Sequence, residues 1–421
     1  MLGSNLRLAY KVLLRRKFFT AVSLFGISFT LVVLMVAVAV LDHMLAARPP
    51  ETRQERTLGL HFAFMKGKSW MWSSEPGFLL LDRYARGLPG VERMSIFTTA
   101  HDVPSYLGGT RINSSLKRTD GEYWKILEFT FLEGRPYTTE DVDQARFVAV
   151  INATSRGRFF GGAPAVGKTF EADGQRFQVV GVVPDVPRLR EVPFADIWVP
   201  LTTAKSDSYR RDLMGDHKAI FLARSASDFP AIKDEFRARL KRVEFTDSHY
   251  DSMSAALETQ AERTASALDV GPKRGFIGTD GQGNTHVGRF WAALGVLAVL
   301  FMLLPTVNLV NLNMSRIMER ASEIGVRKAF GATSRTLVGQ FMVENVALTL
   351  VGGAIGFVLA AIVLHALTAS GLVAYARFEM NGRVFLWGLG LALVFGVLSG
   401  VYPAWRMSRL HPVAALGGGA R

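Results

Sequence analysis

A glycine-rich stretch of the sequence, FGGAPAVGKTF at residues 160–170, has the spacing of a nucleotide-binding loop. Gly162 is followed by four residues and then by the Gly-Lys-Thr triplet at 167–169, which matches the pattern G-x-x-x-x-G-K-S/T. In ATPases this loop surrounds the phosphates with backbone N–H groups, the lysine contacts the β- and γ-phosphates, and the hydroxyl binds Mg²⁺. A working loop of this kind would make the chain an enzyme that hydrolyses ATP.

The elements predicted around this motif do not position it for that chemistry. A phosphate loop leads from a buried strand directly into a helix, whose first N–H groups face the phosphates. Here the strand-like stretch RFVAVI ends at residue 151, well before Gly162, and the segment FEADGQRFQVVGVV after Thr169 predicts a strand, an Asp-Gly turn and a second strand. Lys168 is therefore expected to open a β-hairpin, and we interpret the match as a glycine-rich turn without a catalytic role.

Composition narrows the class of protein. The chain has 421 residues, of which 49% are hydrophobic and 20% charged, and its formal net charge is +13. It contains no cysteine, and its 8 histidines lack the H-x-x-x-H spacing of many zinc enzymes, so no disulfide, metal site or catalytic residue set is predicted. The basic excess suits either nucleic-acid binding or the flanks of membrane-spanning helices.

Four long apolar runs predict a membrane protein. They cover residues 18–41, 290–315, 345–364 and 384–405, and none of them contains a charged residue. A helix rises about 1.5 Å per residue, so about 20 residues cross a hydrocarbon core of about 30 Å. The first run is too long for the apolar part of a signal peptide and no A-x-A cleavage site follows it, so we expect it to be retained.

The predicted fold therefore has four transmembrane α-helices, with a large extracytoplasmic α+β domain between helices 1 and 2. Cytoplasmic flanks are rich in Lys and Arg, and these residues gather before the first run, between the second and third, and after the fourth. Both termini and the second-to-third loop are thus expected in the cytoplasm. This layout explains the basic excess without a nucleic-acid partner, and it places the Gly-Lys-Thr triplet where no ATP is available.

The stretch NLRLAYKVLLRRK before the first run has the pattern of an amphipathic helix, with apolar and basic side chains on different faces. Such a helix lies in the membrane interface, with its cations near anionic lipid headgroups. The alternative is a plain extension of the first span. The membrane-interface residues predicted here are Arg7, Lys11, Arg15 and Arg16.

The segment between the first two runs combines helix and strand signals. Residues 76–87 and 228–243 suit helices, the second with Ile232, Phe236, Leu240 and Val243 on one face. Strands are predicted at 146–151, 176–183, 196–201 and 218–224.

A short charged segment, residues 316–331, separates the second and third runs. On a helix Glu323 and Arg327 attract each other at i and i+4, whereas Glu319 and Glu323 repel. The residues alone leave two interpretations open, a solvated linker or a docking helix for a cytoplasmic partner.

Two pairs of glycines with four-residue spacing lie within or beside the last two runs. Gly352 with Gly356, and Gly396 with Gly400, permit a close approach of neighbouring helices. They are predicted as helix-packing positions, either within the chain or on a dimer face.

Three separate stretches resemble one family. ERASEIGVRKAFGA (319–332) and YPAWRMSRLHPVAAL (402–416) are similar to signatures of the MacB/FtsX-type ABC permeases, and residues 120–186 resemble their periplasmic core domain, where the Gly-Lys-Thr segment belongs to a strand pair. The resemblance covers nearly the whole chain and implies a protein of the bacterial inner membrane. The implied domains are 1–44, the interfacial helix and transmembrane helix 1; 45–287, the MacB-like core domain; and 288–421, the FtsX-like permease domain with helices 2–4.

The resemblance also implies that the chain is not an enzyme and binds no cofactor itself. ATP and Mg²⁺ would bind a separate cytoplasmic ABC ATPase subunit, since the chain begins with the membrane part, and a second permease protomer, identical or different, would complete the complex. A periplasmic adaptor is a further candidate partner. Segment 316–331 would be the coupling helix on the ATPase, with the coupling residues Glu319, Glu323, Gly325, Arg327, Lys328 and Gly331.

The implied function is the transmission of ATPase-driven motion to the extracytoplasmic domain, for export of a peptide, an antibiotic or another amphiphile. Two alternatives stay open: an FtsX-like signalling module that activates a partner such as a cell-wall hydrolase, or a lipoprotein-releasing permease. The glycine-rich connector at 271–285 departs from the family pattern, because it is expected to interrupt the long stalk helix with which efflux members extend the second span.

Overall fold

The computed structural model describes residues 17–107, 110–268, 287–319, 326 and 333–408. The chain divides into two units, which are described separately. The helix unit comprises Met1–His43, Trp291–Leu372 and Phe378–Arg421, and the sheet unit comprises Met44–Phe290 and Val373–Arg377. The chain therefore returns to the sheet unit for five residues after Leu372, a feature that the predicted domain 45–287 did not include.

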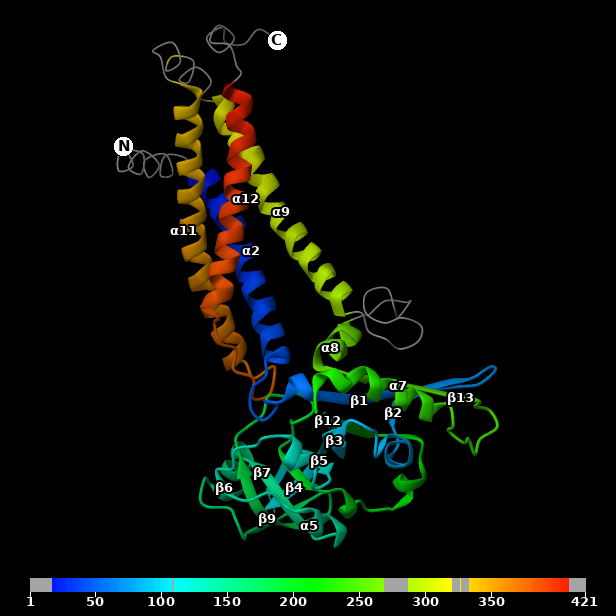
Figure 1. The fold of residues 1–421 in the computed structure, drawn as a ribbon. Coiled ribbons are helices and arrows are strands. Elements are labelled where there is room, and N and C mark those ends of the chain that lie inside the picture. The colour runs from blue at the N-terminus through cyan, green and yellow to red at the C-terminus, as the bar shows by residue number, and fades with distance from the viewer. Residues whose placement is uncertain (1–16, 108–109, 269–286, 320–325, 327–332, 409–421) are drawn as a thin grey trace. The chain divides into compact units, whose positions relative to one another are not determined.

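Four long helices make up the described part of the helix unit (Figure 1). They are α2 (Lys17–Leu45), α9 (Val287–Glu319), α11 (Ser334–Ala369) and α12 (Gly382–Ser408), and each contains one of the predicted apolar runs. Among the described residues, two stretches are long and apolar enough to cross a membrane, Thr20–Leu45 and Met342–Ala369. The apolar parts of α9 and α12 are shorter, Val287–Leu303 and Gly382–Leu398, so four spans stay a prediction.

The sheet unit is built on a 13-stranded sheet (Figure 1). Its strands are β1 (Thr57–Lys66), β2 (Met71–Pro76), β3 (Val91–Thr98), β4 (His101–Leu107), β5 (Thr110–Thr119), β6 (Glu133–Gly134), β7 (Val148–Asn152), β8 (Thr169–Ala172), β9 (Gln175–Val183), β10 (Ile197–Pro200), β11 (Met214–Gly215), β12 (His217–Ala223) and β13 (Ser252–Glu258). The main path runs β10-β7-β9-β8-β4-β5-β3-β12-β1-β2-β11, with β13 paired to β1 and β6 to β9. The predicted strands at 146–151, 176–183, 196–201 and 218–224 correspond to β7, β9, β10 and β12.

One end of this path closes on itself. Strand β10 pairs antiparallel with β7 and parallel with β5, so β10, β7, β9, β8, β4 and β5 form a closed ring of paired strands. Apolar side chains that alternate along these strands fill one buried cluster, which includes Leu116, Ile151, Phe177 and Val199. The ring thus has its own core.

Short helices pack against the sheet, and one of them, α6, contributes Phe159 to the core of the ring. They are α3 (Phe78–Leu80) with the π turn Leu81–Ala85, α4 (Tyr123–Ile126), α5 (Thr139–Asp143), α6 (Ala153–Phe160), α7 (Phe229–Leu240) and α8 (Gln260–Leu268). Helix α7 buries Ile232, Phe236 and Leu240 in a cluster that also contains side chains of β1 and β12, which confirms the predicted apolar face. The helix predicted at 76–87 is shorter, because it is an α turn followed by a π turn.

Candidate functional site

The Gly-Lys-Thr triplet lies in a turn that leads into a strand. Helix α6 precedes Gly162, and β8 begins at Thr169, so the order of elements is opposite to that of a phosphate loop. The N–H of Gly167 donates to the carbonyl of Val179 at 2.8 Å, and the Lys168 ammonium lies 5.2 Å from the Phe160 ring centroid. The predicted β-hairpin is confirmed, and the backbone of the triplet is used within the sheet.

The predicted coupling and interface residues fall largely outside the described part of the chain. Arg7, Lys11, Arg15 and Arg16 lie there, as do Glu323, Gly325, Arg327, Lys328 and Gly331. Glu319 is the last described residue of α9. These assignments, like the interruption of a stalk by the connector 271–285, stay predictions.

Two of the predicted packing glycines lie against α2. A Cβ atom added to Gly352 of α11 would lie 2.9 Å from Cγ2 of Ile27, and one added to Gly356 would lie 3.2 Å from Cβ of Leu31. Both distances are shorter than an ordinary carbon–carbon contact, so α11 and α2 approach closely here because the side chains are absent.

The second pair lies on α12. A Cβ atom on Gly396 would lie 2.5 Å from Oγ1 of Thr349 on α11. The rings of Phe357 and Phe385 meet edge to face along the same pair of helices, with centroids 4.6 Å apart. Gly352, Gly356 and Gly396 thus face helices of their own chain. A role at a dimer face, for these glycines or for Gly400, stays a prediction.

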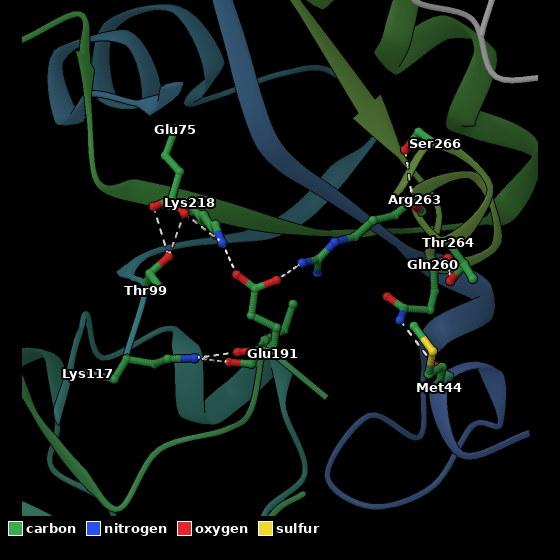
Figure 2. A network of polar contacts seen from close by, with 11 residues as sticks. Met44, Glu75, Thr99, Lys117, Glu191, Lys218, Gln260, Arg263, Thr264 and Ser266 are labelled. Atoms are coloured by element: carbon green, nitrogen blue, oxygen red, sulfur yellow. Dashed lines mark hydrogen bonds and ion pairs between the residues drawn. The ribbon is translucent and has the colours of Figure 1, made fainter. Parts of the chain in front are cut away.

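An extensive polar network of the sheet unit surrounds residues 187–196, which we call the junction loop (Figure 2). This loop links β9 to β10, with Val183 and Ile197 as the flanking strand ends. Its side chains and carbonyls meet buried charges from the sheet and from the segments that leave the sheet unit (Figure 2). Within the described residues no cluster of three or more His, Asp or Glu side chains is arranged to hold a metal ion.

Glu191 is the centre of this network (Figure 2). One carboxylate oxygen accepts from the ammonium of Lys218 on β12, and the other accepts from the guanidinium of Arg263 on α8. Lys218 also lies 3.0 Å from Glu75, which in turn accepts a hydrogen bond from the Thr99 hydroxyl at 2.8 Å. Although burial opposes ionisation, the charges of Arg263 and Lys218 lower the pKa of Glu191 to about 2.

Lys117 of β5 is fully buried next to the same loop. Its ammonium donates to the carbonyl of Glu191 at 2.7 Å and to that of Val192 at 2.5 Å, and it lies 5.1 Å from the Phe97 ring centroid. Burial lowers the pKa of Lys117 to about 7, since desolvation disfavours the charged form. A lysine placed in this way holds the loop to β5.

Arg190 fastens the loop to the segment that follows α2. Its side chain is 5% exposed, and Nε donates to Oε2 of Glu51 at 2.8 Å. The other guanidinium nitrogens donate to the carbonyls of Pro49 at 3.0 Å and Arg48 at 2.7 Å. Burial raises the pKa of Glu51, and the charge of Arg190 opposes that rise.

Helix α8 is fixed at the sheet unit by three polar contacts. Gln260 donates to the carbonyl of Met44 at 3.1 Å, which is close to the end of α2. Glu262 pairs with Lys233 of α7 at 2.7 Å, and Arg263 pairs with Glu191. The junction loop therefore holds, through Arg190 and Glu191, both the segment after α2 and the helix that precedes the connector to α9.

Sequence reasoning did not find this network. Lys117 and Lys218 lie in strand-forming stretches, where a polar residue is normally assigned to the solvent-facing side. The signal available in the sequence was a lysine next to the apolar run AIFLA. This run forms most of β12, and all seven residues of that strand are buried. The partner Glu191 lies in a segment with no periodicity, so its contact with Arg263, 72 residues away, had no signature.

Family models match two successive parts of this chain. The MacB-like periplasmic core domain matches residues 20–239, just over half of the chain, and the FtsX-like permease C-terminal domain matches residues 295–412. The chain belongs to the MacB/FtsX family of ABC transporter permeases. This membership confirms the resemblance inferred from the three sequence stretches, and it makes the sheet unit the counterpart of the family's periplasmic domain.

Two relatives named as ATP-binding/permease proteins are similar over most of this chain. The pyoverdine export ATP-binding/permease protein PvdT of Pseudomonas syringae pv. tomato is 28% identical over 416 residues, which cover 97% of this chain and 58% of that protein. The macrolide export ATP-binding/permease protein MacB of Bdellovibrio bacteriovorus is 24% identical over 330 residues, covering 78% of this chain and 47% of that protein. The chain thus matches less than two thirds of the length of either relative.

Solved structures of extracytoplasmic domains are also similar to part of the chain. The extracellular domain of the ABC-type transporter YknZ from Gram-positive bacteria has 16% sequence identity and a TM-score of 0.37, covering 47% of this chain and 98% of that one. The periplasmic region of MacB from Actinobacillus actinomycetemcomitans has 13% identity and a TM-score of 0.37, covering 51% and 94%.

Proposed function

We propose that this chain is a permease subunit that transmits ATPase-driven motion across the bacterial inner membrane to the sheet unit, and that the motion drives export. The observation that carries the proposal is the match of a periplasmic core domain and a permease domain to successive parts of one chain. The junction loop supports it, because a domain that is moved by helices needs firm attachment to the segments that lead to them.

The proposed layout has four spanning helices, α2, α9, α11 and α12, with both termini in the cytoplasm. The distribution of Lys and Arg at the ends of the apolar runs supports this orientation. The sheet unit would then lie outside the cytoplasm, in agreement with the family's periplasmic core domain.

The proposed partners are a cytoplasmic ABC ATPase, which holds ATP and Mg²⁺, and a second permease protomer. The names of the relatives combine ATP-binding and permease functions, which supports an ATPase that works with this chain. Segment 316–331 is the proposed contact with the ATPase. The export of an amphiphile is supported by relatives named for the export of pyoverdine and of macrolides.

Purification of the full chain from the membranes of its host tests the proposal. We expect an ABC ATPase to accompany it, and we expect nucleotide hydrolysis in nanodiscs to fall when Glu323 is replaced by Lys, because a charge reversal disrupts the proposed docking contact. Lys168→Ala is the matched control and should leave hydrolysis unchanged. Absence of an ATPase, or equal hydrolysis for the wild type and Glu323→Lys, would refute the proposal.

Cysteine labelling tests the orientation, since the chain has no native cysteine. Ala163→Cys lies in an exposed turn of the sheet unit, and Ser322→Cys lies in the proposed coupling segment. A membrane-impermeant maleimide added to spheroplasts should label the first and reach the second only after permeabilisation. Labelling of residue 322 in intact spheroplasts, with residue 163 reached only after permeabilisation, would show that the sheet unit lies in the cytoplasm and would refute the proposed orientation.

A further inference from the structure

The five residues Val373–Arg377, which connect α11 to α12, belong to the sheet unit. The chain leaves the helix unit after Leu372 and returns to it at Phe378. This gives the sheet unit a third chain connection, in addition to the segment after α2 and the segment before α9. A connection between two helices needs only a short turn, so its incorporation into another unit requires specific contacts.

Those contacts are made with the junction loop. The N–H of Arg188 donates to the carbonyl of Ala374 at 3.0 Å. The hydroxyl of Tyr375 donates to Oδ1 of Asp196 at 2.5 Å, and the Tyr375 ring lies 6.4 Å from the Phe194 ring, measured between centroids. The segment is thus bound by backbone, side-chain and ring contacts over one short loop.

Asp196 is itself anchored in the closed ring of strands. It is 6% exposed and directly precedes β10. Its Oδ1 also accepts from Nδ2 of Asn152 at 3.0 Å, and its Oδ2 accepts from the N–H of Ser115 at 2.8 Å. The hydrogen bond of Tyr375 therefore ends on a carboxylate that connects three strands, β10, β7 and β5.

Tyr375 adopts a conformation that depends on these contacts. Its φ angle is +60°, in the left-handed region that is unfavourable for a residue with a side chain. Such a conformation persists where surrounding contacts hold it. A tyrosine hydroxyl is protonated at neutral pH and can donate, and burial together with the hydrogen bond to Asp196 raises the pKa of Tyr375 further, to about 12.

We propose that the junction loop is the site where movement of α11 and α12 is passed to the sheet unit, with Tyr375 as the positioning residue. The loop holds all three connections of the sheet unit: Arg190 binds the segment after α2, Glu191 binds α8, and Asp196 binds Tyr375. A displacement of segment 373–377 is therefore carried directly to β10 and to the other two connections. This inference rests on the proposed function, because it assumes that the helices move.

Hydrogen exchange of the full chain in nanodiscs tests the attachment. Tyr375→Phe removes only the hydroxyl, and a hydrogen bond to a charged group is strong enough that its loss should accelerate exchange at the Arg188 amide by about tenfold. The matched control is Tyr209→Phe, a tyrosine of the same unit whose ring packs on Phe78 and His217. Unchanged exchange at residue 188 in Tyr375→Phe would overturn the proposed role of Tyr375.

The complex with the accompanying ATPase tests the transmission. Trapping the ATPase with vanadate should change the exchange of peptides from 187–196 in the wild type and in Tyr209→Phe. In Tyr375→Phe the change should be lost while ATP hydrolysis persists. Hydrolysis without a vanadate-dependent change at 187–196 in the wild type would refute the inference and leave the proposed function intact.

An engineered disulfide tests whether reattaching segment 373–377 to the junction loop restores transmission in Tyr375→Phe. The N–H of Arg188 and the carbonyl of Ala374 lie within hydrogen-bond distance, so the two backbones are close neighbours, and a disulfide requires Cα atoms about 4.4–6.8 Å apart. Arg188→Cys with Ala374→Cys, added to Tyr375→Phe and oxidised with copper phenanthroline, should restore the vanadate-dependent change, and reduction should abolish it. Failure to restore it, with the bond formed, would refute transmission through this contact. If no ATPase accompanies the chain, the proposed function fails, whereas exchange at Arg188 still decides the role of Tyr375.

Discussion

The turn at 162–169 and the junction loop at 187–196 are short segments of the same unit, and they use their polar groups in different ways. In the turn, the N–H groups of Gly167 and Lys168 bond to Val179 and Ala165 nearby, and Lys168 is exposed. In the junction loop, the bonds reach distant partners, for example Arg263, 72 residues from Glu191, and Tyr375, 179 residues from Asp196. The turn, which matches a known sequence motif, makes bonds that stabilise its own hairpin. The junction loop, which matches no motif, connects distant segments of the unit. Buried polar groups and their partners are therefore the better guide to long-range connections in this unit.

The strongest test of this contrast is Arg190→Ala in the junction loop. Its removal leaves the buried carboxylate of Glu51 without its partner, and breaking a buried ion pair costs about 3–5 kcal/mol. We expect the melting temperature of the full chain in nanodiscs to fall by about 10 °C. The fluorescence of tryptophans such as the buried Trp198 reports the unfolding.

The double variant Arg190→Ala with Glu51→Gln serves as the control for that experiment. It removes the uncompensated charge as well, so it should recover part of the lost stability. A double variant that melts at the same temperature as Arg190→Ala would contradict the ion-pair explanation.

The next largest effect concerns Lys117, whose pKa of about 7 lies below the usual value of about 10.4. Between these values the unfolded chain binds more protons than the folded chain, so this lysine makes stability rise with pH. From pH 7 to pH 9 the wild type should gain about 2 kcal/mol relative to Lys117→Met. If the melting temperatures of the wild type and Lys117→Met changed with pH in parallel, Lys117 would not have the low pKa. As the control, Lys168→Met should show the same pH dependence as the wild type.

Glu191→Gln should have a smaller effect. The substitution keeps the shape but removes the charge that faces Lys218 and Arg263, and because the carboxylate is 38% exposed we expect a loss of only about 1 kcal/mol at pH 7. The pKa of Glu191 is lowered to about 2, so its contribution is complete above the unfolded value of about 4.3 and is lost as pH falls towards 2. The two melting temperatures should therefore converge between pH 5 and pH 2, and a constant difference would argue against the ion pairs.

The smallest effect is expected for Lys168→Ala in the turn. An exposed side chain of this kind contributes within about 0.5 kcal/mol, and its backbone bonds remain. Stability and ATP hydrolysis by the complex should both stay at the wild-type level. A large loss of hydrolysis with normal expression would restore the phosphate-loop interpretation and reverse the contrast between the two segments.

Local elements of the fold could be predicted because their signals are local. Uncharged runs predicted the four long helices, and the spacing of Ile232, Phe236 and Leu240 predicted the buried face of α7. The Asp173-Gly174 pair predicted the hairpin, and its φ angles of 52° and 69° are those of a tight turn with both central residues in the left-handed region.

The candidate site could not be predicted in the same way. Arg190 binds residues 48–51, and Asp196 binds Tyr375, across distances in the sequence over which no periodic pattern extends. Lys218 lies in a predicted strand and Lys117 in a segment for which no strand was predicted, and nothing in either sequence shows where Glu191 lies. Only the pairing of the strands brings these groups together.

The return of Val373–Arg377 to the sheet unit bears on how this domain can be handled in isolation. An excised fragment of residues 44–290 would lack the tyrosine that caps Asp196 and the carbonyl that receives the Arg188 amide. It would expose to water, and to any binding partner in the assay, the side of the Asp196 carboxylate that Tyr375 covers in the full-length polypeptide. Affinities measured on such a truncation would describe an artificial surface.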